Sequence, residues 1–180
     1  ADATGQTEPI QATLKELARG ELPWRWLNTR PWSARAPVRL GLVCDYLAIG
    51  GHERMLVNML KGLDRERFHP AVYAFRGGEL VQTIEDLGVP LTLGSQGDPF
   101  AWRHNWTKRD VAEKTAWIDG LAKALRRDRI DAVVNFAWPY GVQSARDAGV
   151  EVTIERLDGP GILGKIEDKS SFDEVVCESR

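Results

Sequence analysis

Two adjacent glycines, Gly50 and Gly51, stand directly before a predicted helix over residues 52–61, and this loop has the clearest potential for chemistry. Glycines at such a place let a ligand approach the backbone closely, and the N–H groups of a first helical turn attract anions. The pair therefore indicates a phosphate-binding loop. A tight turn that needs glycine for a positive φ is the alternative, because this loop contains neither GxGxxG nor Gly-Lys-Ser/Thr.

The histidines and a second glycine-rich segment indicate no further site. His52, His69 and His104 lack the spacing of metal ligands, and no cysteine pair lies near them, so no metal is expected. Residues 159–164 spell GxGxxG, but a proline interrupts the pattern and there is no room for the acidic residue that would bind a ribose. A dinucleotide cofactor is therefore not expected.

Apolar runs and helical periodicities alternate regularly from residue 38 onward. Strands are predicted over residues 38–44, 70–75, 91–93, 130–136, 150–154 and 174–177, and helices over 52–61, 80–87, 111–125 and 141–148. Such alternation is typical of βαβ units, and apolar runs without polar alternation indicate strands that are buried on both faces. The expected fold is α/β, a doubly wound, mostly parallel, Rossmann-like sheet with helices on both faces.

Residues 1–37 differ from this pattern and are predicted to form an N-terminal extension of helical and irregular chain. Ile10, Leu14 and Leu17 mark one apolar helical face. Three tryptophans follow in an irregular stretch: Trp24, Trp26 and Trp32. We expect the extension to pack on the main domain, residues 38–180; a linker and a sugar-stacking platform are alternatives. Because residue 1 is not methionine, we expect a chain that is processed or excised from a longer protein.

Length and composition bound the class of protein. The chain has 180 residues, 43% of them apolar, with 24 Lys plus Arg against 26 Asp plus Glu. These values argue against disorder and against nucleic-acid binding. No apolar run could span a membrane, and residues 102–109, which mix indoles with cations, fit a loop before a helix better than a membrane contact. Cys44 and Cys177 lie in apolar runs and indicate buried free thiols in a reducing cytoplasm.

The segment Ile49–Leu63 closely resembles the first glycine loop and helix of glycosyltransferase family 4 enzymes, which have the GT-B architecture. Further segments resemble the family in the same order along the chain. They lie at residues 64–68, 78–80, 87–90, 126–134, 148–150 and 172–179. The resemblance covers residues 38–180 and points to the N-terminal, acceptor-side domain of such an enzyme.

In this family two Rossmann-like domains face a cleft, the first holding mainly the acceptor and the second the nucleotide sugar. The resemblance implies that the chain is the acceptor-binding half of a nucleotide-sugar-dependent glycosyltransferase, whose C-terminal donor domain is the missing partner. It also implies a retaining reaction in the full enzyme, a sugar or glycoconjugate acceptor, and a nucleotide sugar as donor. This half would contribute no cofactor and no catalytic residue, and the isolated chain is expected to be inactive.

The resemblance also implies roles for particular residues. Gly50 and Gly51 match the loop that approaches the donor phosphates or the transferred sugar. Glu53 and Arg54 match the family's acidic–basic pair, for which an ordinary helix start is the alternative. Where relatives often have a histidine after the fourth strand, this chain begins a different segment with Asn135. A histidine-assisted acceptor role is therefore not expected.

Two later loops complete the expected site. Trp138 and Tyr140 follow the fourth strand and are expected either to stack on a sugar or an apolar acceptor, or to pack in the core. Glu155, Arg156 and Asp158 follow the fifth strand, where relatives line the cleft. The resemblance makes these three residues candidate partners for hydroxyls or phosphates.

A non-catalytic, flavodoxin-like binding or regulatory module is the alternative from another functional class. A phosphate-accepting receiver needs clustered acids after the first strand, an aspartate at the end of the third and a lysine after the fifth. Here Asp45 stands alone, the third strand ends at Gly94, and Glu155 follows the fifth. The sequence argues against a receiver and leaves a regulatory domain without catalysis open.

Overall fold

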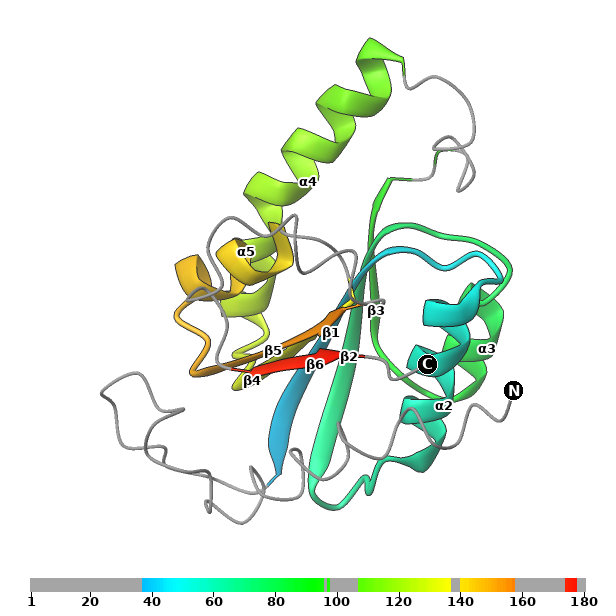
Figure 1. The fold of residues 1–180 in the computed structure, drawn as a ribbon, viewed down its shortest axis with the longest axis vertical. Coiled ribbons are helices and arrows are strands. Elements are labelled where there is room, and N and C mark those ends of the chain that lie inside the picture. Colours follow the sequence, from blue (N-terminus) through cyan, green and yellow to red (C-terminus); the bar gives the residue numbers. More distant parts are fainter. Residues whose placement is uncertain (1–36, 96, 98–106, 137–139, 158–173, 178–180) are drawn as a thin grey trace.

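The computed structural model describes residues 37–95, 97, 107–136, 140–157 and 174–177. These residues form one layer of strands with helices on both sides (Figure 1). Residues 1–36, and with them the expected packing of the N-terminal extension, lie outside the described residues.

Six strands form the sheet. They are β1 (Val38–Tyr46), β2 (Phe68–Arg76), β3 (Leu91–Ser95), β4 (Ala132–Asn135), β5 (Val152–Leu157) and β6 (Glu174–Cys177). Their order is β3-β2-β1-β4-β5-β6, and every neighbouring pair is parallel. The chain thus winds outward in one direction from β1 and in the other from β4, which confirms the predicted doubly wound, Rossmann-like α/β fold.

Helices cover both faces of this sheet. α2 (Gly51–Gly62) and α3 (Val81–Asp86) lie on one side, and α4 (Lys108–Arg127) and α5 (Tyr140–Ala148) lie on the other (Figure 1). The N-terminal half of α4 extends beyond the sheet in this view. Thr107 and Asp110 form a reciprocal capping box at that end, which satisfies N–H groups of the first turn and explains why α4 begins there.

Alternate residues of β1 contribute to two separate hydrophobic cores. Leu40 and Leu42 pack on one face with Met55, Leu56 and Met59 of α2. The other core combines strand residues Val43, Tyr73 and Phe75 with α4 residues Trp117, Leu121 and Leu125. Burial on both faces explains why the central strands read as almost unbroken apolar runs.

Four strands, β1, β2, β3 and β5, extend further toward their carboxyl ends than the sequence predicted, whereas β4 ends one residue earlier. β1 continues through Tyr46, which lies opposite Arg76 of β2. β5 reaches Leu157 because its pairing with β4 and then with β6 continues, with Asn135 opposite Glu155 and Leu157 opposite Cys177. Glu155 and Arg156 therefore lie within a strand and not, as predicted, in the loop that follows it.

All six strands end at the same edge of the sheet, which we call the carboxyl edge. The strand order reverses between β1 and β4, so the topological switch point of this fold lies between their carboxyl ends. Among the described helices, none is long and apolar enough to cross a membrane. Cys44 is a buried free thiol, as predicted, and burial raises its pKa well above the ordinary value.

Candidate functional site at the carboxyl edge

The structure brings part of the predicted site together at the carboxyl edge. Gly50 is the N-cap of α2, Gly51 is its first residue, and Tyr140 begins α5. Glu155 and Arg156 belong to β5, where only their backbone is described. Two further predicted residues, Trp138 and Asp158, lie outside the described residues.

The glycine loop has an ordinary backbone. Gly50 has φ −147° and ψ −179°, an extended conformation that any residue adopts, and the positive-φ glycines of the described chain are Gly88 and Gly149. A Cβ atom added to Gly51 would meet no protein atom within 4 Å. The alternative of a tight turn that needs glycine for a positive φ is therefore wrong, and the fold itself requires no glycine at position 51.

The first turn of α2 carries the predicted acidic–basic pair. Gly50 provides no side chain to cap the helix, and Glu53 lies close enough that a Cβ on Gly50 would collide with its carboxylate. Arg54 is exposed on the same turn, and its N–H donates to the carbonyl of Gly50 at 3.2 Å. The start of α2 thus presents an exposed backbone beside a carboxylate and an exposed guanidinium.

The loop between β2 and α3, which we call the bracing loop, contacts the glycine loop. A Cβ on Gly78 would lie 2.5 Å from the carbonyl carbon and oxygen of Leu47, so only glycine permits this close approach. The N–H of Leu80 donates to the oxygen of Leu47 at 2.9 Å, and the N–H of Ile49 donates to the carboxylate of Glu79 at 3.2 Å. These contacts fix the loop between β1 and α2.

Three polar side chains meet at the switch point, and we call them the edge triad: Asp45, Lys114 and Tyr140. Lys114 Nζ lies 3.1 and 2.9 Å from the two carboxylate oxygens of Asp45. The Tyr140 hydroxyl donates to Oδ1 of the same carboxylate. The triad thereby joins the end of β1 to the helices α4 and α5.

Tyr140 contributes its hydroxyl and not its ring to the carboxyl edge. The residue is only 7% exposed and packs in the core beneath α4 and α5, with Lys114 Nζ 4.9 Å from the ring centroid. Burial, followed by the charge of Asp45, raises the pKa of its phenol far above the ordinary value. This position favours core packing, one of the two alternatives, over stacking on a sugar.

Asn135 is buried at the end of β4. A Cβ on Gly141 would collide with its side-chain oxygen, so α5 approaches the strand closely only because residue 141 is glycine. The Phe136 N–H donates to the oxygen of Val43 at 2.6 Å, which ties this strand end to β1. Asn135 therefore acts in packing α5 against the sheet.

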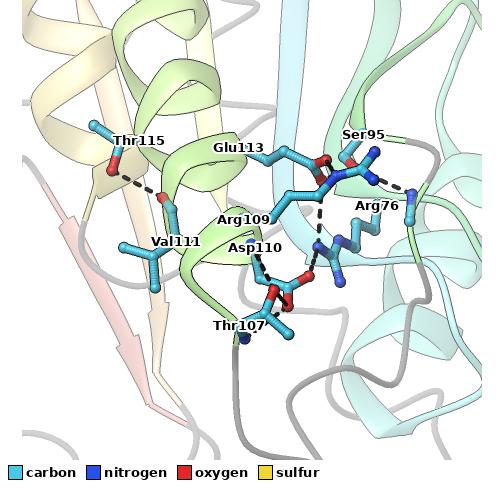
Figure 2. Close-up of polar contacts among 9 residues, drawn as sticks. Arg76, Ser95, Thr107, Arg109, Asp110, Val111, Glu113 and Thr115 are labelled. Carbon is cyan, nitrogen blue, oxygen red and sulfur yellow. Dashed lines mark hydrogen bonds and ion pairs between the residues drawn. The ribbon is translucent and has the colours of Figure 1, made fainter.

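A second polar network surrounds Arg76 at the end of β2 (Figure 2). Its side chain is 1% exposed and its guanidinium contacts the carboxylates of Asp110 and Glu113 on α4. Ser95, at the end of β3, donates to Glu113 at 2.6 Å and accepts from the N–H of Gly97 at 3.1 Å. Figure 2 shows these groups converging on the start of α4.

This network shifts the pKa of both acidic partners. Hydrogen bonds from Arg76 and then Thr107 hold the pKa of the Asp110 carboxyl well below its ordinary value. A hydrogen bond from Ser95, followed by one from Arg109, lowers the pKa of Glu113. Both carboxylates remain ionised and anchor α4 to the strands, so the network positions the helix that supplies Lys114.

Sequence reasoning did not select Asp45 or Lys114, the two residues that contact Tyr140 in the edge triad. Asp45 lacked acidic neighbours and Lys114 resembled an ordinary helix cation, although a charged residue ending an apolar strand is a usable signal. The described residues contain no group of three or more His, Cys, Asp or Glu side chains that could hold a metal ion.

No family model and no curated protein sequence matches this chain. Among solved structures, Acinetobacter baumannii MurG matches with a TM-score of 0.50 and 14% identity, over 67% of this chain and 35% of that one. A mutant of the Thermobaculum terrenum O-GlcNAc transferase matches with a TM-score of 0.49 and 18% identity, over 81% and 28%.

The match to MurG supports the fold. At 14% identity it says that this chain shares an architecture with part of MurG, and the resemblance to the GT-B architecture is confirmed at this level. The chain spans about a third of the length of the MurG chain, 35% of it. Activity and substrate must therefore be argued from the residues at the carboxyl edge.

Proposed function

We propose that this chain is the acceptor-binding half of a nucleotide-sugar-dependent glycosyltransferase of the GT-B type. The glycosyltransferase-like segment Ile49–Leu63 coincides with the loop and helix that follow the central strand β1. Ligands of open α/β sheets bind beyond the carboxyl ends of the strands, where this loop lies. Sequence resemblance and topology thus agree on one part of the molecule.

The observation that carries the proposal is the open space at Gly51. Neither its backbone conformation nor its neighbours in the fold require glycine, and a side chain there would project into free volume at the start of α2. A bound ligand that approaches the backbone would occupy that volume. We therefore assign the small size of residue 51 to ligand binding.

The neighbouring charge favours the transferred sugar over the donor phosphates at this position. The Glu53 carboxylate lies beside Gly50, where it would accept hydrogen bonds from hydroxyl groups and repel a phosphate. Arg54 is exposed on the same turn and is available to a more distant anionic group. The first turn of α2 would thus orient the sugar ring while phosphates are held elsewhere.

In this proposal the chain positions substrates, and the chemistry is completed by a C-terminal donor domain that binds the nucleotide sugar. Holding acceptor and donor in line lowers the entropic cost of the reaction, and it requires no nucleophile or metal from this half. A retaining reaction and a cytoplasmic location are parts of the same proposal. The buried thiol of Cys44 fits a reducing compartment.

The test compares two glycine substitutions in the protein extended beyond Arg180 by the segment that follows in its reading frame. Gly51→Val should abolish sugar transfer and leave the melting temperature nearly unchanged, because the added methyl groups meet only a ligand. Gly120→Val is the matched control, since a Cβ on this helical glycine of α4 also meets no atom within 4 Å. It should keep both transfer and melting temperature.

Four outcomes would contradict the proposal. Full transfer by Gly51→Val would remove the glycine loop from the site. A large loss of melting temperature in Gly51→Val alone would favour a structural role for this glycine. Consumption of nucleotide sugars by the 180 residues alone would show that the chain is not half of an active site, and absence of transfer by the extended protein would favour a regulatory module.

A further inference from the structure

We propose that Asp45, held in place by Lys114 and Tyr140, binds hydroxyl groups of a neutral sugar or polyol at the switch point between β1 and β4. The identification of this ligand as the acceptor rests on the proposed function. The subsite itself rests on the geometry of the edge triad, none of whose contacts was expected from the sequence.

The place of Asp45 in the topology is the first argument. It is the penultimate residue of β1, and β1 and β4 are the strands between which the sheet order reverses. In doubly wound folds, ligands bind in the crevice at this point, outside the carboxyl ends of the strands. Its two partners come from the two helices that cover one face of the sheet, Lys114 from α4 and Tyr140 from the start of α5.

The remaining bonding capacity of the carboxylate is the second argument. The side chain of Asp45 is 29% exposed, although residues 40–44, which precede it in β1, are all buried. A carboxylate has about four acceptor positions. Within the described part of the chain, Oδ1 accepts from Lys114 and Tyr140, and Oδ2 accepts only from Lys114. Oδ2 can therefore accept a hydroxyl hydrogen bond without losing a partner.

Preorganisation is the third argument. The carboxylate cannot rotate without breaking bonds to two separate helices, and the Lys114 ammonium is itself placed over the rings of Phe75 and Tyr140. The network of Arg76 with Asp110 and Glu113 fixes the turn of α4 next to Lys114. A ligand would thus find Asp45 already oriented, which reduces the entropic cost of binding.

The charge of the site selects the ligand class. Lys114 is paired with Asp45, so the triad offers no excess positive charge to a phosphate. Glu79 and Glu53 add carboxylates along the loop that follows β1, at Ile49 and at Gly50. An anionic group would be repelled, whereas hydroxyl groups donate to carboxylates in charge-assisted hydrogen bonds. We therefore expect neutral polyols to bind and their phosphates to bind more weakly.

The experiment is a nuclear magnetic resonance titration of the isotopically labelled 180-residue chain. The probes are the methyl glycosides of glucose, mannose, galactose and N-acetylglucosamine, and glucose 1-phosphate is the anionic comparison. The backbone amides of Asp45, Tyr46 and Tyr140 should shift with at least one glycoside. Asp45→Asn should weaken that binding about tenfold or more, as expected for loss of a charge-assisted hydrogen bond.

Asp128→Asn is the matched control. Asp128 also accepts a hydrogen bond from a buried tyrosine, Tyr73, and is paired with a cation, but it lies at the other end of α4. Its side chain is 32% exposed, close to the value for Asp45. Because no strand ends there, this substitution should change glycoside affinity by less than about twofold.

Each outcome decides the proposal. It is overturned if no glycoside shifts these amides in the wild-type chain, if Asp45→Asn binds as tightly as wild type, or if glucose 1-phosphate binds better. The wild-type titration decides the matter even if a variant fails to fold. Glycoside binding at Asp45 without sugar transfer by the extended protein would contradict the proposed function alone, and transfer without such binding would contradict this inference alone.

Discussion

Two groups of similar chemistry lie at opposite ends of α4. In the edge triad, Asp45 accepts from Tyr140 and is paired with Lys114. In the second group, which we call the C-cap triad, Tyr73 donates to Asp128 at 2.8 Å, and Arg127 lies 2.7 Å from the same carboxylate. Both tyrosines pack in the same hydrophobic core.

The two groups differ in what holds them and where they lie. Arg127 is 65% exposed and adjacent in sequence to its partner, whereas Lys114 is 20% exposed and joins Asp45 across 69 residues. The C-cap triad lies where α4 ends, away from the carboxyl edge of the sheet. The edge triad lies at the switch point on that edge. Similar residue chemistry therefore lies at the end of a helix in one place and, in our proposal, offers a ligand contact in the other.

The largest expected effect that tests this comparison is the alkaline behaviour of the tyrosines. The chain has three, and burial raises the pKa of Tyr46 to about 12 and those of Tyr73 and Tyr140 further. Because the folded state favours the neutral phenols, their contribution to stability is complete below pH 10 and is lost as the pH rises through the folded pKa values.

Absorbance of phenolate should therefore stay low in the folded protein at pH 10 and appear together with alkaline unfolding. Tyr140→Phe should remove one of the three tyrosines from that late step and Tyr73→Phe another. A phenolate signal near pH 10 in the folded chain that disappears in Tyr140→Phe or Tyr73→Phe would show that the corresponding triad leaves its tyrosine accessible.

Truncating the two aspartates should have a smaller but unequal effect. Asp45→Ala should lower the free energy of unfolding by about 2 kcal/mol, because a buried phenol and a mostly buried ammonium lose their carboxylate. Asp128→Ala should cost less, about 1 kcal/mol, because the buried Tyr73 phenol loses its acceptor whereas the exposed Arg127 is solvated by water. Urea unfolding of both variants measures the two losses in the free energy of unfolding. Equal losses would mean that the different exposure of Lys114 and Arg127 does not change the contribution of their triads to stability.

The smallest expected effect concerns acid stability. The hydrogen bond from Arg127 lowers the pKa of Asp128, so its contribution to stability is present above the unfolded pKa of about 4 and is lost as the pH falls through the lower folded value. Asp128→Asn should make the decline of the urea midpoint below pH 4 slightly shallower, and added salt should reduce this difference. If Asp128→Asn leaves the slope of the urea midpoint against pH unchanged at low salt, the interaction between Arg127 and Asp128 contributes nothing to acid stability.

The fold was predictable because its signals are local. The apolar runs of the central strands report burial on both faces, and the spacing of Met55, Leu56 and Met59 reports the buried face of α2. The loop before that helix was also recognisable, since Gly50 and Gly51 directly precede it. Less predictable were the strand ends, because the length of β5 depends on how far its neighbours continue to pair.

The candidate site was predictable only in part. Sequence reasoning selected Tyr140 for its aromatic ring, yet the structure buries the ring and directs the hydroxyl to Asp45. It assigned Asp45 no role, because this residue has no acidic neighbour in the sequence. Its partners Lys114 and Tyr140 are 69 and 95 residues away in the sequence. The spacing of apolar residues within a segment carries no information about contacts between segments so far apart.

The sequence by itself determined the alternation of strands and helices, the two-sided burial of the sheet and the position of the glycine loop, because each follows from residues within a few turns or strand steps of one another. Only the tertiary structure decided that Asp45, Lys114 and Tyr140 meet. That meeting requires the order in which the strands assemble, since placing β4 beside β1 brings α4 and α5 over the end of β1. Strand order is set by packing over the whole sheet, and no local segment encodes it.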